Sequence, residues 1–189
     1  MPDESEKRVN EGFIGGAERR AIIIADYDPQ WPRRFEREAA KIRRALGPAA
    51  LAIEHVGSTS VPGLAAKPIV DILLVVEDSS DEDAYLPELL GAGYVLRVRE
   101  PGFEEHRMVR TPKKHVHVHI FSTGSREGER LLLMRDHLRH DKADRDLYAS
   151  IKRELASRDW PTMQHYADAK TQVIQEILVR ARRSARKPR

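Results

Sequence analysis

Apolar and polar residues follow two different periods along the chain, which predict a mixture of helices and strands. Apolar residues recur at helical spacing around 35–46, 131–138, 147–155 and 173–181, and a capped helix is expected at 78–90. Strand-like alternation or short apolar runs occupy 51–56, 68–76, 94–99, 105–110 and 115–121, and a further short strand is expected at 21–24. The strands lie between an opening helix and a helical end. We therefore expect an α/β fold, a mixed sheet flanked by helices with a helical C-terminal part.

The two ends of the chain lie outside this pattern. Residues 1–19 are polar and contain glycine, which predicts a mobile N-terminal arm. Residues 181–189 contain basic residues and no acid, and we interpret them as a solvated basic tail. The remaining segment, 20–180, is long enough to form one domain around a hydrophobic core.

Composition narrows the expected partners and location. The net charge is +3, but six of the 33 Lys and Arg residues stand in the acid-free segment 180–189, so the rest of the chain is slightly acidic. This distribution argues against a nucleic-acid partner, because a basic end is more often solvated than bound. The absence of cysteine excludes disulfides and thiolate chemistry. No apolar run has the length of a membrane span or signal segment, so we expect a cytoplasmic protein with no membrane contact.

Glycine and hydroxyl residues follow the strand predicted at 51–56, as Gly57-Ser58-Thr59-Ser60. Glycine permits a tight turn, and successive N–H groups and hydroxyls can bind an anion such as phosphate. Lys67 lies a few residues further on and could neutralise phosphate charge. Hairpins and helix caps use the same residue types, so this turn alone does not define a site.

A single acid, Asp71, interrupts the apolar run 68–76. Such a carboxylate is a metal ligand, the partner of a buried cation, or a group at a strand end that faces solvent. His115, His117 and His119 alternate along another predicted strand, so their imidazoles share one face. Neighbours at that spacing are roughly 7 Å apart, too far for all three to bind one metal, but one or two could join Asp71 if the strands are adjacent. The alternative is a set of polar residues on a solvent-facing sheet surface.

Segment 53–72, which contains the turn, Lys67 and Asp71, closely resembles the signature of the GrpB family, placed in the nucleotidyltransferase superfamily. The resemblance extends upstream to 27–31, and downstream to the histidine strand and to 135–139. It also includes two pairs in the helical end, Tyr148 with Lys152 and Tyr166 with Lys170. In total it covers roughly residues 22 to 180.

The resemblance implies a nucleotidyltransferase-like fold in which a Gly-Ser turn holds a nucleoside triphosphate and carboxylates hold divalent metal. Gly57 and Ser58 match the turn, and Asp71 matches the first carboxylate. The position of the second carboxylate is Leu73, and His117 or His119 stands nearest to the third. Leucine cannot bind Mg²⁺, so the usual two-metal site cannot be assembled from the matching positions. Histidine also shifts the preference toward Zn, Mn, Fe or Ni.

These residues together define a candidate site. The candidate catalytic residues are Asp71 and Lys67, and the candidate ligands of a divalent metal (Mg or Mn, with Zn suggested by the histidines) are Asp71, His117 and His119. The candidate nucleotide- and phosphate-binding residues are Gly57, Ser58, Thr59, Ser60, Lys67, Arg135 and Arg139. The two arginines stand one helical turn apart and would form a second cationic surface, unless they only pair with neighbouring elements.

Three functions remain open at this point. The leading hypothesis is an enzyme that binds a nucleoside triphosphate with divalent metal and transfers NMP to an acceptor that the sequence does not identify. The second is a non-catalytic nucleotide- or phosphometabolite-binding module, which Leu73 favours because a lost carboxylate removes chemistry sooner than binding. The third is a His/Asp metal-dependent hydrolase or lyase that uses the histidine strand.

Overall fold

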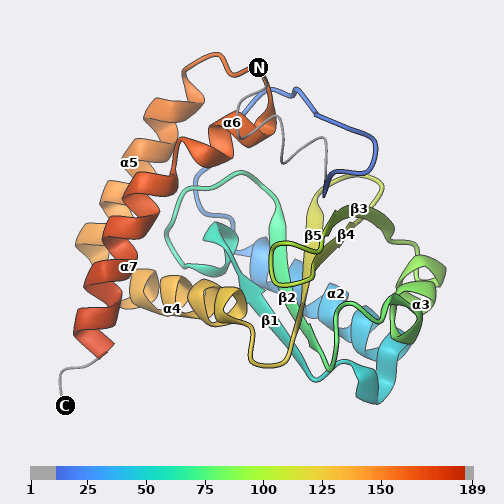
Figure 1. The fold of residues 1–189 in the computed structure, drawn as a ribbon. Helices are drawn as coiled ribbons and strands as arrows, with labels where there is room; N and C mark the ends of the chain where they lie inside the picture. The colour runs from blue at the N-terminus through green and yellow to red at the C-terminus, as the bar shows by residue number, and fades with distance from the viewer. Residues whose placement is uncertain (1–11, 186–189) are drawn as a thin grey trace.

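The computed structural model describes residues 12–185 and contains a five-stranded mixed sheet in the order β1-β2-β5-β4-β3 (Figure 1). The central strands β2 (Val70–Val76) and β5 (Val116–Ser122) are parallel, and every other neighbouring pair is antiparallel. The outer strands are β1 (Ala52–Val56), β4 (His106–Arg110) and β3 (Val95–Glu100). The α/β class and the mixed sheet predicted from the sequence are confirmed.

Helices lie on both faces of this sheet and form most of the C-terminal part. The α-helices with their bounds are α2 (Gln30–Leu46), α3 (Leu86–Gly91), α4 (Arg126–His140), α5 (Lys142–Ala156), α6 (Met163–Asp168) and α7 (Thr171–Ala185). Short 3₁₀ turns cover Gly47–Ala49, Ser58–Ser60 and Glu82–Ala84. No helix in the range 12–185 combines the length and apolar character needed to cross a membrane.

Two elements predicted from local pattern are wrong. Segment 21–24 is not a strand: the only pairing nearby is an isolated bridge between Ala25 and Ala66, and Ile23 is largely exposed. The helix expected at 78–90 divides into a 3₁₀ turn and the short α3. Tyr85 breaks it with a φ of −149°, because its buried hydroxyl donates a hydrogen bond back to the Ser79 carbonyl.

Alternation along β2 divides the sheet into an apolar face and a face that carries Asp71. Val70, Ile72 and Leu74 are fully buried, in one cluster with Trp31 and Ile42 of α2, the helix behind the sheet in Figure 1. On the opposite face Leu73 packs with Val56 and Phe121, beneath α4. Asp71 precedes Leu73 on that same face, which therefore combines a small apolar cluster with the polar side chains of the site.

The C-terminal helices pack against the loop that follows β1. Val61 and Leu64 of this loop share a buried cluster with Leu138 of α4, Tyr148 of α5 and Ile177 of α7. In Figure 1 α5 and α7 run side by side, and α6 connects them to the region above the sheet. This packing fixes the loop between β1 and β2 and places α6 and α7 over the open half of the Asp71 face.

The described part of the expected N-terminal arm, residues 12–19, is bonded to the domain. Phe13 forms a bridge with Val98 of β3, and the Glu18 carbonyl accepts a hydrogen bond from the Met163 amide. The Glu18 carboxylate lies 2.7 Å from Arg110 and 3.1 Å from Lys114, and the Arg110 hydrogen bond is the main reason that its pKa falls to about 2. Residues 12–19 are therefore a strap across the sheet edge. Residues 181–185 of the expected basic tail complete α7, and 1–11 and 186–189 lie outside the described range.

Leu73→Ala tests the closed part of the Asp71 face. The side chain is 1% exposed, so its truncation leaves a cavity, and we expect the free energy of unfolding to fall by about 2–5 kcal/mol. Leu147→Ala on the solvent side of α5, where the leucine is 40% exposed, is the matched control, with a loss of about 0.5 kcal/mol. Urea denaturation measures both. Equal losses would contradict the burial of Leu73 beneath α4.

Candidate functional site

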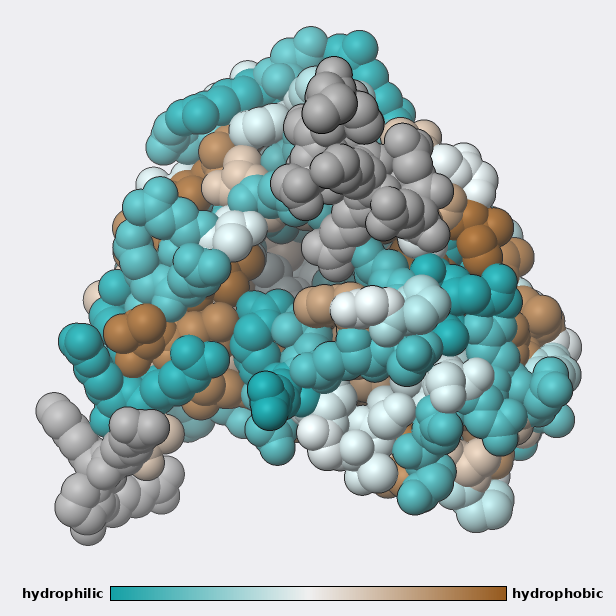
Figure 2. All heavy atoms as spheres, viewed as in Figure 1, coloured by the Kyte–Doolittle hydropathy of each residue, from teal (hydrophilic) through white to brown (hydrophobic). Residues whose placement is uncertain are grey.

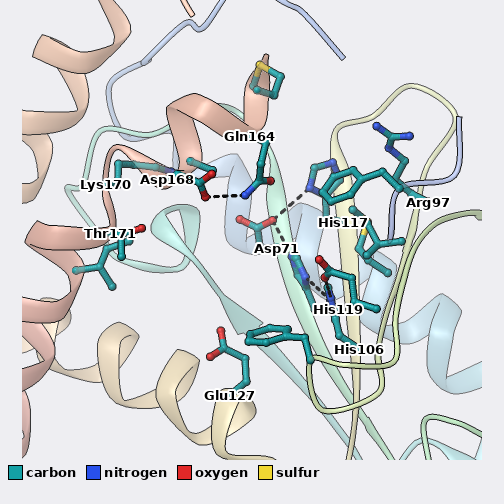
Figure 3. Close-up of a pocket in the computed structure, with 18 of the residues that line it drawn as sticks. Asp71, Arg97, His106, His117, His119, Glu127, Gln164, Asp168, Lys170 and Thr171 are labelled. Carbon is teal, nitrogen blue, oxygen red and sulfur yellow. Dashed lines mark hydrogen bonds and ion pairs between the residues drawn. The ribbon is translucent and has the colours of Figure 1, made fainter. Parts of the chain in front are cut away.

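A cavity of about 940 Å³ lies between the Asp71 face of the sheet and helices α6 and α7. Asp71 of β2 and His117 and His119 of β5 line its floor, and Lys170 lines the side next to the helical part (Figure 3). Lys67 is also among the lining residues. The strap contributes Phe13, Ala17 and Glu18. Figure 2 shows this side of the molecule, where hydrophilic residues surround a recess between the helices and the sheet.

The three predicted metal ligands converge on this floor. Asp71 is directly opposite His117 in the parallel β2–β5 pair, and His119 follows two residues later on the same face. The Asp71 Oδ1 atom lies 3.6 Å from His117 Nδ1 and 3.5 Å from His119 Nε2. The third residue of the histidine strand, His115, precedes β5 and is not among the residues that line the cavity.

Charge and burial keep the Asp71 carboxylate ionised and the His117 ring neutral. Burial alone would raise the pKa of Asp71, but the contact with His119 and the nearby His117 and Lys67 outweigh it and lower that pKa. Burial lowers the pKa of His117 to about 4, against the opposing effect of Asp71. A neutral His117 has one nitrogen with a free lone pair, as a metal ligand requires. Its Nε2 atom is buried and has no hydrogen-bond partner in the described chain.

The predicted Gly-Ser turn lies directly against Asp71. Gly57 has a φ of +68°, and a Cβ atom at this position would stand 2.5 Å from Asp71 Oδ2, so only glycine permits both the turn and the close approach. The Thr59 hydroxyl donates to the Ile69 carbonyl, and the Ser60 hydroxyl donates to the Gly57 carbonyl. Both side chains are buried within the turn, and Ser58 is half-buried beside Tyr148. The turn thus supports Asp71, while the cavity lining proper begins at Lys67 and Asp71.

The structure does not bring Arg135 and Arg139 to the cavity. Arg139 donates two hydrogen bonds to the Ser60 carbonyl, at 2.9 and 3.1 Å. Arg135 binds the Glu54 carboxylate at 2.7 Å and the His55 carbonyl at 3.2 Å. Both guanidinium groups therefore hold the β1 end and the turn from the side of α4. Their contacts match the alternative considered for them, pairing with neighbouring elements, and not a second phosphate-binding surface.

Lys170, which the sequence-based site omitted, joins Lys67 beside the aromatic ring of Tyr166. The two Nζ atoms lie 4.6 and 5.3 Å from the ring centroid. Burial and the neighbouring Lys67 lower the pKa of Lys170 to about 7, and burial also lowers the pKa of Lys67. Among the described residues no ion pair joins either amine to a carboxylate, although the charge of Asp71 acts on both at longer range. The sequence did mark Tyr166 and Lys170 as a matching pair, but helical spacing alone gives no reason to place them in a site.

Two further buried residues near the site, Glu100 and His106, were also not predicted from the sequence. His106 Nδ1 lies 2.8 Å from Glu100 Oε2, and its Nε2 lies 3.2 Å from His119 Nδ1. These residues belong to β3 and β4, and their link to His119 exists because β4 pairs with β5. The sequence carries no local signal for this arrangement, because it depends on the order of strands in the sheet.

The two-metal arrangement does not fit this face. Leu73, at the position of the second carboxylate, is opposite His119 and buried among apolar side chains. The start of α4 lies above it, where a Cβ atom on Gly128 would contact the Leu73 methyl groups at 3.7 Å. One carboxylate and two imidazoles do fit a single metal that accepts nitrogen ligands.

The arrangement of sheet and helices is similar to that of a solved nucleotide-polymerising enzyme. A structure of the Cid1 poly(U) polymerase with MgGTP bound is similar with a TM-score of 0.50 over 72% of this chain and 45% of that one, at 16% identity. This likeness confirms the nucleotidyltransferase-like fold and shows the fold alone.

The chain belongs to the GrpB family, whose sequence model, described as GrpB protein, matches residues 21–180. It is 55% identical over 179 residues to the UPF0157 protein BH1888 of Halalkalibacterium halodurans. The aligned residues cover 95% of this chain and 91% of that protein. The crystal structure of conserved protein GrpB from Enterococcus faecalis is similar with a TM-score of 0.78 and 34% identity, over 87% of this chain and 100% of that one.

Gly57→Ala tests whether the turn and Asp71 must touch. The substitution adds a methyl group against Asp71 and strains a positive φ, whereas Gly63→Ala, at a φ of +79° with no atom near, adds strain alone. We expect Gly63→Ala to cost about 1–2 kcal/mol in urea denaturation, and Gly57→Ala to cost clearly more. Equal costs would show that the contact with Asp71 places no constraint on the turn.

Proposed function

We propose that the protein binds a nucleoside triphosphate in this cavity, through a single divalent metal held by Asp71, His117 and His119. Transfer of NMP to an acceptor is the reaction that the fold favours, and binding without transfer is the alternative that Leu73 favours. The observation that carries the proposal is the position of the three metal-ligand candidates at the floor of a cavity whose side holds two lysines. Neither lysine forms an ion pair with a carboxylate of residues 12–185.

The spacing of the candidate ligand atoms suits one metal ion. Two ligands that are each about 2.1 Å from a tetrahedral zinc lie about 3.4 Å apart. The separations of 3.5 and 3.6 Å between Asp71 Oδ1 and the two imidazole nitrogens are close to this value. The donor set indicates Zn, Mn, Fe or Ni more than Mg. When bound, such an ion would polarise a phosphoryl oxygen and offset its charge.

The cations around the cavity differ in whether they already form an ion pair. Arg97 and Arg110 are already engaged by Glu18, at 3.9 and 2.7 Å. Lys67 and Lys170 instead rest on the Tyr166 ring, and an anion between them would supply the missing counter-charge. A triphosphate that reaches from the metal on Asp71 toward these amines would satisfy both groups. The cavity volume of about 940 Å³ is at the upper end of the usual range for ligand pockets.

Asp71→Asn separates the candidate functions. We expect the melting temperature of the wild-type protein to rise with ATP, CTP, GTP or UTP in the presence of Mn²⁺ or Zn²⁺, because ligands that bind the folded state stabilise it. Asp71→Asn is nearly isosteric but lacks the charge, so the rise should disappear. His115→Ala, outside the cavity lining, should retain it.

The pattern of responses then distinguishes the three functions. Nucleotide stabilisation followed by pyrophosphate release supports transfer, and stabilisation without release supports a binding module. Stabilisation by metal with indifference to every nucleotide supports a metal-dependent hydrolase or lyase. If neither metal nor nucleotide changes the melting temperature of the wild type, the proposed site is wrong.

Lys170 predicts a pH dependence of nucleotide affinity. Its pKa of about 7 in the free protein should rise beside a triphosphate, since the charged amine is the form that binds an anion. The contribution of Lys170 is therefore full below pH 7 and is lost as the pH rises above it, by at most about tenfold in affinity per pH unit.

Titration calorimetry between pH 7.5 and 9, where the phosphates stay fully ionised, measures this dependence. Lys170→Met should bind more weakly than the wild type at pH 7.5, with a difference that shrinks toward pH 9. Lys170→Arg keeps its charge over this range and should remove most of the dependence. A wild-type affinity with the same pH profile as Lys170→Met would exclude Lys170 from the phosphate site.

A further inference from the structure

Four side chains form a continuous series of polar contacts that ends at the cavity floor. Glu100 Oε2 lies 2.8 Å from His106 Nδ1, and His106 Nε2 lies 3.2 Å from His119 Nδ1. The other nitrogen of His119, Nε2, lies 3.5 Å from Asp71 Oδ1. Figure 3 shows His106 and His119 in line beneath Asp71, with dashed lines along the contacts.

Glu100 and His106, at the inner end of this series of contacts, are buried, and aromatic packing holds the His106 ring. Glu100 and His106 are 8% and 6% exposed. The His106 ring stacks on Phe121 at 4.7 Å and lies nearly parallel to His119 at 5.4 Å, and the edge of Phe103 approaches it at 6.1 Å. These contacts fix the plane of His106 and therefore the directions in which its two nitrogens point.

The direction of the hydrogen bonds follows from the carboxylate at the inner end. An ionised Glu100 only accepts, so His106 Nδ1 carries a proton and donates it. In neutral His106 the Nε2 atom is then an acceptor, and His119 must donate to it from Nδ1. A neutral His119 with its proton on Nδ1 presents a lone pair on Nε2. That lone pair faces the Asp71 carboxylate, and two acceptors 3.5 Å apart can share a cation placed between them.

We propose that Glu100 and His106 are positioning residues that hold His119 in the Nδ1–H tautomer and direct its Nε2 lone pair, together with Asp71, at a divalent metal that prefers nitrogen ligands. This proposal rests on the metal centre of the proposed function. A carboxylate that orients a ligating imidazole is a general means of tuning a metal site, and here a second imidazole relays the effect. Zn²⁺ gains from a fixed lone pair on nitrogen, whereas Mg²⁺ binds oxygen.

The protein contains a second histidine–carboxylate pair outside the cavity, and this pair provides a matched control. His137 Nε2 lies 2.7 Å from Asp144 Oδ2, and neither residue lines the cavity. Asp144 is also bound by Arg180 of α7 at 2.7 Å, so this pair ties the C-terminal helices together. His137→Phe therefore breaks a buried contact of similar length without any effect expected on the cavity floor. Because His137, Asp141 and Asp144 also have ligand atoms within 4.8 Å of one another, the same variant reveals any Zn²⁺ that binds there and not at Asp71.

His106→Phe tests the proposal, because phenylalanine keeps the aromatic packing and removes the acceptor for His119. The first measurement uses metal-free protein with ¹⁵N-labelled histidine at pH 8, with the His119 signals assigned from His119→Asn. We expect His119 as the Nδ1–H tautomer in the wild type and in His137→Phe. In His106→Phe we expect the Nε2–H tautomer, since Asp71 is then the acceptor left to His119.

The second measurement is the affinity for Zn²⁺ alone, by competition with a chromophoric chelator. We expect His106→Phe to bind Zn²⁺ about 10- to 100-fold more weakly than the wild type, and His137→Phe to bind as the wild type does. An unchanged Zn²⁺ affinity in a folded His106→Phe overturns the proposal. An Nε2–H tautomer of His119 in the wild type also overturns it, and that result does not require any variant to fold.

Failure of the metal centre itself gives a different result. If wild type and Asp71→Asn bind Zn²⁺ equally, the metal site of the proposed function is wrong. If Asp71→Asn loses Zn²⁺ and His106→Phe keeps wild-type affinity, the metal site stands and the positioning role of Glu100 and His106 is wrong.

Discussion

The register of the parallel pair β2–β5 is the constraint on which the site depends. It sets Asp71 opposite His117 and Leu73 opposite His119, so the polar atoms of two strands meet at one point. A slip of one residue along either strand would turn its face over and send Asp71, or both imidazoles, into the cluster beneath α2. An unpaired charge there costs several kcal/mol. The packing of Val70, Ile72 and Leu74 against α2 therefore also specifies the geometry of the cavity floor.

Local pattern predicts the strands well, because alternation reports directly on burial. The runs 68–76 and 115–121 become β2 and β5, and each face carries the residues that period two assigns to it. Local pattern does not give strand order. From the pattern alone, the contact of Asp71 with the imidazoles is predicted only if their strands are adjacent, and the resemblance supplies the fold in which they are. Neither the local pattern nor the resemblance predicted Glu100 and His106 as site residues, because their contact with His119 depends on the pairing of β4 with β5. Arg135 and Arg139 show the same limit for helices: spacing shows that they share a face, not which neighbour that face meets.

The positive groups beside the strap and the cavity are of two kinds. Some form ion pairs that stabilise the fold, and two amines have no ion-pair partner among the described residues. Arg97, Arg110 and Lys114 surround one carboxylate, Glu18, and so attach the strap to the sheet edge. Lys67 and Lys170 have an aromatic ring in place of a carboxylate, and their lowered pKa values record the cost of burying both charges together. An anion removes this cost and an apolar ligand does not. The phosphate binding proposed for the cavity thus depends on a counter-charge that is missing within the described chain.

Leu73 links the metal chemistry to the packing of α4. A carboxylate at this position would stand next to Asp71 on the same face and would place a second negative charge under a helix that contacts Leu73 through apolar side chains. The leucine instead closes that part of the face, and the histidines of β5 are the remaining ligands of the proposed metal, on the other side of Asp71. In the proposed reaction an acceptor would therefore approach the metal from the side of α6, α7 and the strap, which line the cavity. A site with one metal and an approach from one side constrains the acceptor more than the two-metal arrangement does, because the same ion must serve the nucleotide and face the incoming group.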